Sequence, residues 1–136
     1  MKEIFSFSAS EFTEDEDIIQ HFGMRGRNLM DLAALGIPIL PGFILTEAFL
    51  AEDEEDPEAH VPIYLESFGK MGNILEKMWD ADNPLLVKLV VSPMLNMVHT
   101  FSSIHNVGLC DTTIEGFASF VGEDFAYHEY RGVLRR

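Results

Sequence analysis

The chain has 136 residues, of which 47% are hydrophobic, so it fits a single domain over residues 1–136 and is not a disordered chain. Its 23 acidic and 9 basic residues give a formal net charge of -14. This charge argues against nucleic acid and against an anionic membrane as partners, because both would be repelled. Any site for an anion must therefore be a local island of positive charge.

Cysteine content and the N-terminal residues bear on the compartment. The single cysteine, Cys110, excludes an internal disulfide and a cysteine-based zinc site. The first residues lack the long apolar segment of a signal peptide, and no run approaches the length of a membrane span. We therefore expect a cytoplasmic protein.

The first third of the chain predicts a strand, two helices and a second strand. A short strand is expected over residues 4–7, a turn over residues 8–13, and a short helix that begins with the acids at 14–17. The segment 23–46 then reads as a loop, an amphipathic helix ending at Gly36, a proline turn and a strand over residues 43–46. This segment is the element around which the rest of the chain is organised.

The predicted loop at residues 23–28 has the composition of an anion site. Its candidate ligand-binding residues are Gly23, Arg25, Gly26, Arg27 and Asn28. Backbone N–H groups at a helix start, together with fixed positive charge, are what a phosphate needs. The alternative is that the two glycines form an ordinary loop and that the two arginines only solvate the helix start.

The middle and the end of the chain predict further helices and one strand. Thr46 caps a helix over residues 47–50, the acids at 52–56 form a solvated linker, and Pro57 opens a helix whose apolar positions run from Val61 to Trp79. A central strand is expected over residues 85–91 and a helix over residues 94–107. A capping box at Thr112 and Glu115 begins a helix through Val121, and a last helix carries the apolar positions 125–133.

Histidine positions do not predict a metal site. His60, His99 and His105 show no spacing of i and i+4 with a nearby acid, and His128 is adjacent to Glu129, so those two side chains point apart on a helix. No serine, histidine and aspartate arrangement suggests a nucleophilic triad. We therefore predict no metal ligand and no catalytic residue.

Five segments together resemble one enzyme family, pyruvate, phosphate dikinase, and they follow one another in the family's order with similar spacing. The segments are residues 23–29 (GMRGRNL, against GGKGANL), 35–43 (LGIPILPGF, against G-[LI]-P-V-P-P-G-F), 83–87 (NPLLV, against NPLLVSVRSG), 106–116 (NVGLCDTTIEG, against NLGLND-ETVEG) and 125–131 (FAYHEYR, against FAYDSYRR). The resemblance implies part of an ATP-grasp nucleotide-binding domain, which in this family phosphorylates a mobile histidine domain. Phosphoenolpyruvate is then made on a separate barrel. Because only the front of the ATP-grasp region is covered, we expect that this chain alone cannot perform the family's overall reaction.

The chain departs from the family where the chemistry is expected. Arg25 replaces a lysine that approaches the nucleotide phosphates, and a guanidinium is not equivalent to an ammonium. Val90 replaces an arginine that contacts phosphate, and a valine cannot stabilise transferring phosphoryl charge. Residues 97–103 lack the proline, glycine and aspartate of the family's MPGMMDT segment. The resemblance therefore implies a retained scaffold and a degenerate site.

Together these patterns predict an α+β, α/β-like domain in which a small mixed sheet of about three strands packs with several helices, like part of an ATP-grasp lobe. The predicted function is a non-catalytic, dikinase-like module for assembly with a second copy or with a protein partner. The alternative is weak binding of ATP or phosphate at residues 23–28, with Mg-ATP as the ligand that the family implies. An active phosphotransferase ranks last.

Overall fold

The computed structural model describes residues 4–77, 82–93 and 103–135, which fall into two compact units. Of the described residues, the first unit comprises 4–71 and 91–93, and the second comprises 72–77, 82–90 and 103–135. The α+β class is confirmed, since helices and short strands alternate along the chain. In the order of the chain the elements are β1 (Ile4–Phe7), α1 (Glu16–Ile19), α2 (Gly23–Ala34), β2 (Gly42–Leu45), α3 (Glu47–Glu55), the 3-10 helix η1 (Pro57–His60), α4 (Val61–Leu75), β3 (Val87–Leu89), β4 (Ile104–Val107), α5 (Ile114–Val121) and α6 (Glu123–Leu134).

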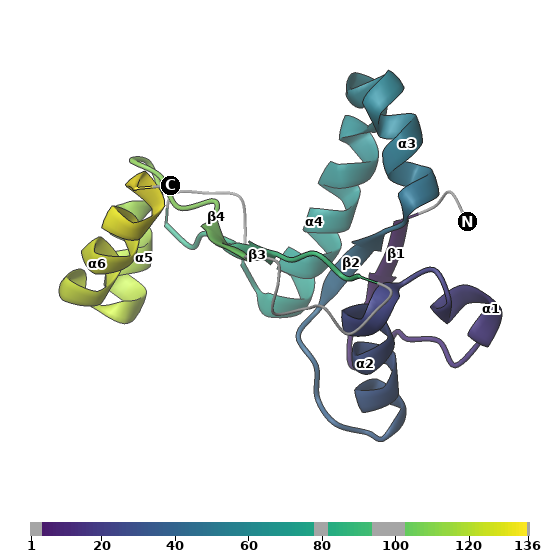
Figure 1. The fold of residues 1–136 in the computed structure, drawn as a ribbon. Helices are drawn as coiled ribbons and strands as arrows, with labels where there is room; N and C mark the ends of the chain where they lie inside the picture. The colour runs from purple at the N-terminus through teal and green to yellow at the C-terminus, as the bar shows by residue number, and fades with distance from the viewer. Residues whose placement is uncertain (1–3, 78–81, 94–102, 136) are drawn as a thin grey trace. The chain divides into compact units, whose positions relative to one another are not determined.

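In the first unit, helices cover both faces of the antiparallel pair β1–β2. Figure 1 shows α1 and α2 on one side of this pair and α3 and α4 on the other. Alternation along β1 explains the arrangement, because successive side chains of a strand point to opposite faces. Phe5 and Phe7 join the core with residues of α1 and α2, and the Phe5 ring lies 4.9 Å from that of Phe22. On the other face, Phe43 of β2 meets Phe68 of α4 edge to face at 4.9 Å.

The fully buried side chains of the first unit are large, so they dominate its packing energy. Phe22, Met30 and Phe49 each expose 2% or less of their surface. Truncating a buried Phe to Ala costs about 3–5 kcal/mol, because both transfer energy and packing are lost. These three positions therefore fix how α2 and α3 lie on the sheet.

In the second unit, the hairpin of α5 and α6 packs against β4. Leu109, Ile114 and Ala126 form its buried core. Gly122, with φ 95, joins the two helices, which confirms the predicted end of α5. The Asn106 amide on β4 donates to the Glu129 carboxylate on α6 at 2.8 Å, which ties the strand to the helix.

The predicted mixed sheet of about three strands is wrong. The described residues form two separate antiparallel pairs, β1–β2 and β3–β4. The expected central strand is the short β3, whose last two residues are exposed, and it pairs with β4. The predicted helix over 94–107 is wrong at its end, where residues 104–107 are a strand, while residues 94–102 lie outside the described part. Pairing with β3 decides this segment, since its weak helical spacing is ambiguous by itself.

The acidic run at residues 52–56 is not a linker as predicted, because helix α3 includes this run as far as Glu55. Thr46 does cap this helix, as predicted, by accepting from the Phe49 N–H at 3.3 Å. The helix extends because His60 Nδ1 meets Asp53 Oδ1 at 2.9 Å and the His60 ring lies against that of Phe49, tilted by 41° with the ring centroids 4.6 Å apart. A contact seven residues away thus orders a stretch whose charges alone favour a coil.

Two helix boundaries also differ from prediction. The long helix predicted from Val61 ends at Leu75, where Glu76 takes the left-handed conformation with φ 57, and Met78 and Trp79 lie outside the described residues. The predicted capping box is wrong, because the N-cap of α5 is Thr113 and its side chain does not cap the helix. The Thr113 hydroxyl instead donates to the Gly108 carbonyl at 2.8 Å and accepts from the Cys110 N–H at 2.9 Å.

Candidate functional site

The candidate site is the start of α2, where the sequence predicted a phosphate loop. Residues 23–28 are not a loop, because α2 begins at Gly23 and includes them all. Its N-cap, Phe22, contributes no side-chain hydrogen bond to the first turn. The N–H groups that open the helix therefore need partners from elsewhere.

Those partners come from residues 92 and 93. The Ser92 hydroxyl accepts from the N–H groups of Arg25 and Gly26, each at 3.1 Å, and donates to the Phe22 carbonyl at 2.6 Å. The Met24 N–H donates to the Pro93 carbonyl at 2.8 Å. The N–H groups of residues 24–26 are thus engaged by the protein's own chain in this structure. A phosphate at this position would have to displace Ser92.

The two glycines of the segment allow close packing of the protein on itself. Gly23 is buried with φ 72, and a Cβ there would stand 1.8 Å from the Ser92 carbonyl oxygen. A Cβ at Gly26 would stand 2.6 Å from Phe22 Cβ. The glycine pattern that suggested a cradle for a ligand therefore serves contact between α2, its own N-cap residue and residue 92.

The two arginines differ in their environment. The two terminal guanidinium nitrogens of Arg27 donate to the Glu16 carboxylate on α1, one of them at 3.1 Å. This contact lowers the pKa of Glu16 and raises that of Arg27, chiefly through the hydrogen bonds themselves. Arg25 is half-buried, and Asn28 is exposed on the outer face of α2. Since Arg27 is paired with an acid, the positive island that an anion needs is smaller than the sequence suggested.

The other candidate groups do not converge on a reaction centre. Val90, at the position of the family's phosphate-contacting arginine, is 37% exposed. The described residues hold no cluster of three or more His, Cys, Asp or Glu side chains that could bind a metal ion. Within the same described ranges, no helix has both the length and the hydropathy that a bilayer span requires.

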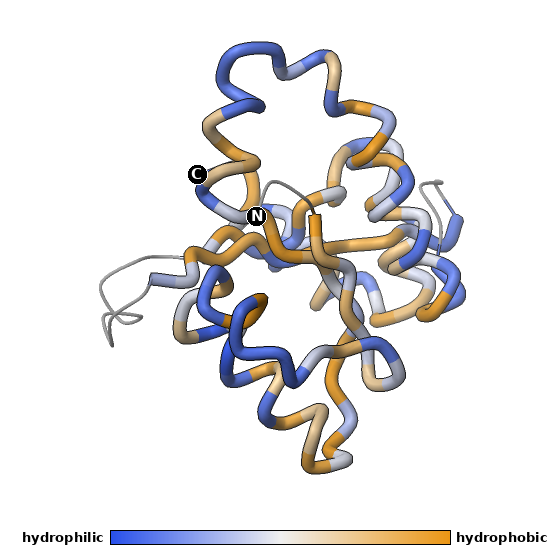
Figure 2. The backbone as a smooth tube through the Cα atoms, turned by 90° about the vertical axis from the view of Figure 1, so that its right-hand side faces the viewer, coloured by the Kyte–Doolittle hydropathy of each residue, from blue (hydrophilic) through white to orange (hydrophobic). Residues whose placement is uncertain are grey.

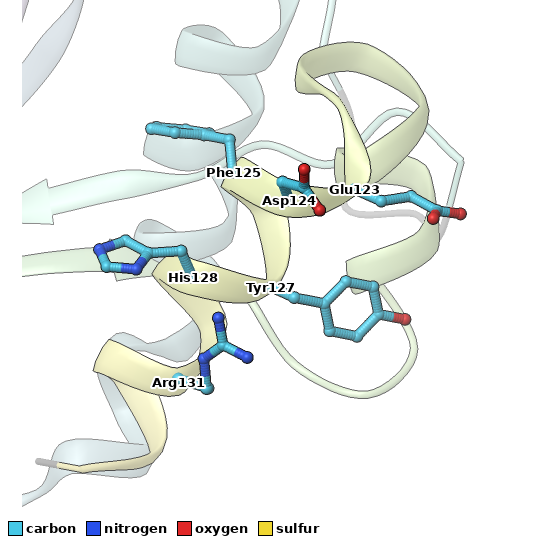
Figure 3. Close-up of a pocket in the computed structure, with 6 residues that line it drawn as sticks. All are labelled: Glu123, Asp124, Phe125, Tyr127, His128 and Arg131. Atoms are coloured by element: carbon cyan, nitrogen blue, oxygen red, sulfur yellow. The ribbon is translucent and has the colours of Figure 1, made fainter.

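An open hollow of about 570 Å³ lies on α6, lined by Glu123, Asp124, Phe125, Tyr127, His128 and Arg131. Figure 3 shows that these side chains leave the helix in diverging directions, with Phe125 and His128 on one side and Tyr127 and Glu123 on the other. Groups that diverge from one helix cannot surround a ligand. This hollow is the outer surface of α6.

Sequence reasoning missed the residue at the centre of the α2 contacts. Ser92 is 66 positions from Gly26, and a lone serine before a proline carries no local signal for capping a distant helix. In the alignment that puts Val90 at the family's arginine, Ser92 falls at the glycine of the NPLLVSVRSG segment. That substitution was the one available hint that a side chain stands at this point.

Comparison with known proteins identifies the relatives of this chain. The pyruvate, phosphate dikinase of Treponema pallidum is 38% identical over 115 residues, which cover 83% of this chain and 12% of that protein. This chain is a homologue of part of pyruvate, phosphate dikinase. The chloroplastic dikinases of Mesembryanthemum crystallinum and Arabidopsis thaliana are 27% and 28% identical, and each alignment covers 98% of this chain.

The match covers only a small part of each dikinase. The chain spans 12% of the Treponema protein and 15% and 14% of the two plant proteins. No protein-family model matches it. The comparison therefore confirms the resemblance to the dikinases that the sequence motifs indicated, and it confirms it for a segment of those enzymes.

Proposed function

We propose that this chain is a non-catalytic, dikinase-like assembly module that buries apolar surface against a second copy of itself. The observation that carries the proposal is the apolar surface between α2 and β2, defined by Leu32, Leu35, Ile37 and Leu40. Leu35 and Leu40 are each 76% exposed, and Leu32 and Ile37 are 38% and 45% exposed. In Figure 2 the lowest turn of the chain, which joins α2 to β2, is drawn mainly in orange.

Exposed apolar side chains that follow one another along the chain favour association. Single exposed leucines are ordinary, but contiguous apolar patches mark interaction surfaces on soluble proteins. The two-stranded sheets add open edges, which also favour association. The closed start of α2 supports the non-catalytic part of the proposal, because Ser92 occupies the N–H groups that an anion would use.

The net charge sets the conditions for assembly. Two copies that each carry a formal charge of -14 repel one another. Salt screens this repulsion, since the Debye length falls from about 10 Å at 0.1 M to about 3 Å at 1 M ionic strength. Apolar burial is not screened, so association through the α2–β2 surface should strengthen as salt is added.

Surface variants test the proposal. Leu35→Ser and Leu40→Ser change side chains that are mostly exposed, so they should preserve the fold and lower the average mass measured by light scattering. Leu134→Ser is the matched control, since Leu134 is 67% exposed but belongs to the second unit. Equal loss of mass in all three variants would contradict the assignment of this surface.

The competing function is weak binding of ATP or phosphate through Gly23, Arg25, Gly26, Arg27 and Asn28. A ligand that binds the folded state raises the melting temperature by mass action. Under the assembly proposal, Mg-ATP and inorganic phosphate leave the melting temperature unchanged in both the parent chain and Arg25→Ala. A shift that Arg25→Ala abolishes would instead favour the nucleotide site.

A further inference from the structure

A second hollow lies in the first unit, between the α3–α4 face of β1 and one side of α4. Its volume is about 280 Å³. This volume lies just below the range of about 300–1,000 Å³ that is typical of ligand pockets, so any occupant is small. The hollow is formed entirely within the first unit and shares no residue with the α2 site or the α2–β2 surface.

The chain periodicities explain why these side chains meet. Ile4 and Ser6 are two residues apart on β1, so both side chains lie on the face that is turned away from the α1–α2 core. The α4 residues that line the hollow are Ile63, Glu66, Ser67 and Lys70, which are spaced at i, i+3, i+4 and i+7 and so form one helical stripe. Phe49 of α3 completes the lining.

The lining divides into an apolar part and a charged part. Phe49 is buried at 2% exposure, and Ile63 extends the apolar part toward solvent at 40% exposure. Ser67 is 5% exposed and its hydroxyl donates to the Ile63 carbonyl at 3.0 Å, which leaves its oxygen lone pairs to accept. Glu66 and Lys70 are exposed, and thus place one negative and one positive charge at the rim.

The two rim charges are available to a ligand. Glu66 precedes Lys70 by four residues, the order that favours an ion pair along a helix. Neither rim residue takes part in the ion pair of Arg27 with Glu16 or in the contact of His60 with Asp53. An acid and a base on one stripe, next to an apolar wall, match a small molecule that carries both charges and an apolar body.

We propose that this hollow binds a free α-amino acid with an aliphatic side chain. Its ammonium group meets Glu66, its carboxylate meets Lys70, and its side chain lies against Phe49 and Ile63. The strongly negative field of the chain disfavours a ligand with only a carboxylate, while a zwitterion carries no net charge. This inference stands apart from assembly, because the α2–β2 surface contributes nothing to the hollow.

Titration of the full chain by two-dimensional 1H–15N NMR tests the proposal, with L-leucine as the probe. We expect saturable shifts confined to the amides of β1 and α4 that line the hollow. The matched probes are 3-methylbutylamine, which lacks the carboxylate, and 4-methylpentanoate, which lacks the ammonium group. L-leucine should bind more tightly than the amine, and the carboxylate should bind least.

Charge-neutral variants locate the two contacts. Glu66→Gln should weaken L-leucine binding about two- to fivefold, the range of an exposed ion pair. Lys70→Gln should remove the preference for L-leucine over 3-methylbutylamine. Glu58→Gln on η1 and Lys88→Gln on β3 make the same charge changes at residues that do not line the hollow, and they should leave the affinity unchanged. The proposal is overturned by shifts that do not saturate, by shifts outside the hollow, or by equal weakening in the control variants.

Discussion

Replacing Ser92 by alanine tests the contact that closes the start of α2. The substitution removes the acceptor of the Arg25 and Gly26 N–H groups and the donor to the Phe22 carbonyl. Loss of a helix-capping hydroxyl costs about 1 kcal/mol. The Phe22 carbonyl also loses the hydroxyl that donates to it at 2.6 Å, and the loss of such a hydrogen bond adds about 1 kcal/mol. We therefore expect the free energy of unfolding to fall by about 2 kcal/mol.

The expected change in melting temperature follows from the length of the chain. Unfolding entropy is about 2.1 cal/mol/K per residue, which gives about 0.29 kcal/mol/K for the whole chain. A loss of about 2 kcal/mol then lowers the melting temperature by about 7 °C. Circular dichroism during heating and during urea titration measures both quantities.

Ser119→Ala is the matched control for this prediction. The Ser119 hydroxyl is exposed and donates to the Gly116 carbonyl of its own helix at 2.8 Å. Its loss should change the free energy of unfolding by no more than about 0.5 kcal/mol. If Ser92→Ala were no more destabilising than Ser119→Ala, the proposed closure of the α2 start would be refuted.

Three further predictions concern backbone fit, an ion pair and the free thiol. Gly23→Ala should destabilise the fold by about 3 kcal/mol or more in urea unfolding, against about 1 kcal/mol for Gly36→Ala. Both glycines have positive φ, but a Cβ meets backbone within 2 Å only at Gly23 and finds nothing within 4 Å at Gly36. Glu16→Gln should make the free energy of unfolding depend less on pH in acid. The contact with Arg27 lowers the pKa of Glu16 in the folded state, so it adds stability above the unfolded pKa of 4.5, and this stability is lost as the pH falls through the folded pKa. Hydrogen bonds, first from the Thr112 side chain, lower the pKa of Cys110 to about 7, so its alkylation by iodoacetamide should be half-maximal near pH 7 and should move to higher pH in Thr112→Val.

Each of these predictions has a distinct contrary result. Equal destabilisation by Gly23→Ala and Gly36→Ala would show that residue 92 does not approach Gly23. An unchanged pH dependence of stability in acid for Glu16→Gln would show that the contact between Arg27 and Glu16 does not persist in solution. Alkylation that is half-maximal near pH 9 in the parent chain would exclude the hydroxyl contacts to the thiol.

Local signals in the sequence predicted the elements that depend on local physics. The strand at Ile4–Phe7 follows from its short apolar run, and the cap at Thr46 follows from its place before a helical run. Gly36 and Gly122 end helices as their positions predicted, because both take positive φ at little cost. These features need no knowledge of distant residues.

Contacts between distant residues decided the parts that the sequence did not predict. Residues 23–28 become helical because residues 92 and 93 supply their hydrogen-bond acceptors. The segment at 104–107 becomes a strand because Val87 and Leu89 pair with it. The acidic run remains helical to Glu55 because His60 holds Asp53. A pattern of residue types carries no record of such partners.

The candidate site shows the same division. The sequence predicted a loop at residues 23–28, whereas these residues form the first turns of α2, and their glycines allow close backbone packing there. It attributed that closeness to a ligand, whereas Ser92 is the group that approaches. Ligand binding at Gly23, Arg25, Gly26, Arg27 and Asn28 stays a prediction that the thermal-shift series addresses.

The central claim is that the chain assembles through apolar surface, and its molar mass in solution tests this claim most directly. Sedimentation equilibrium of the full chain, over a dilution series at low and high salt, measures that mass. We predict a mass above the 15.4 kDa of one chain, which increases with protein concentration and with salt. A mass of 15.4 kDa at every concentration and at both salt levels would contradict the claim.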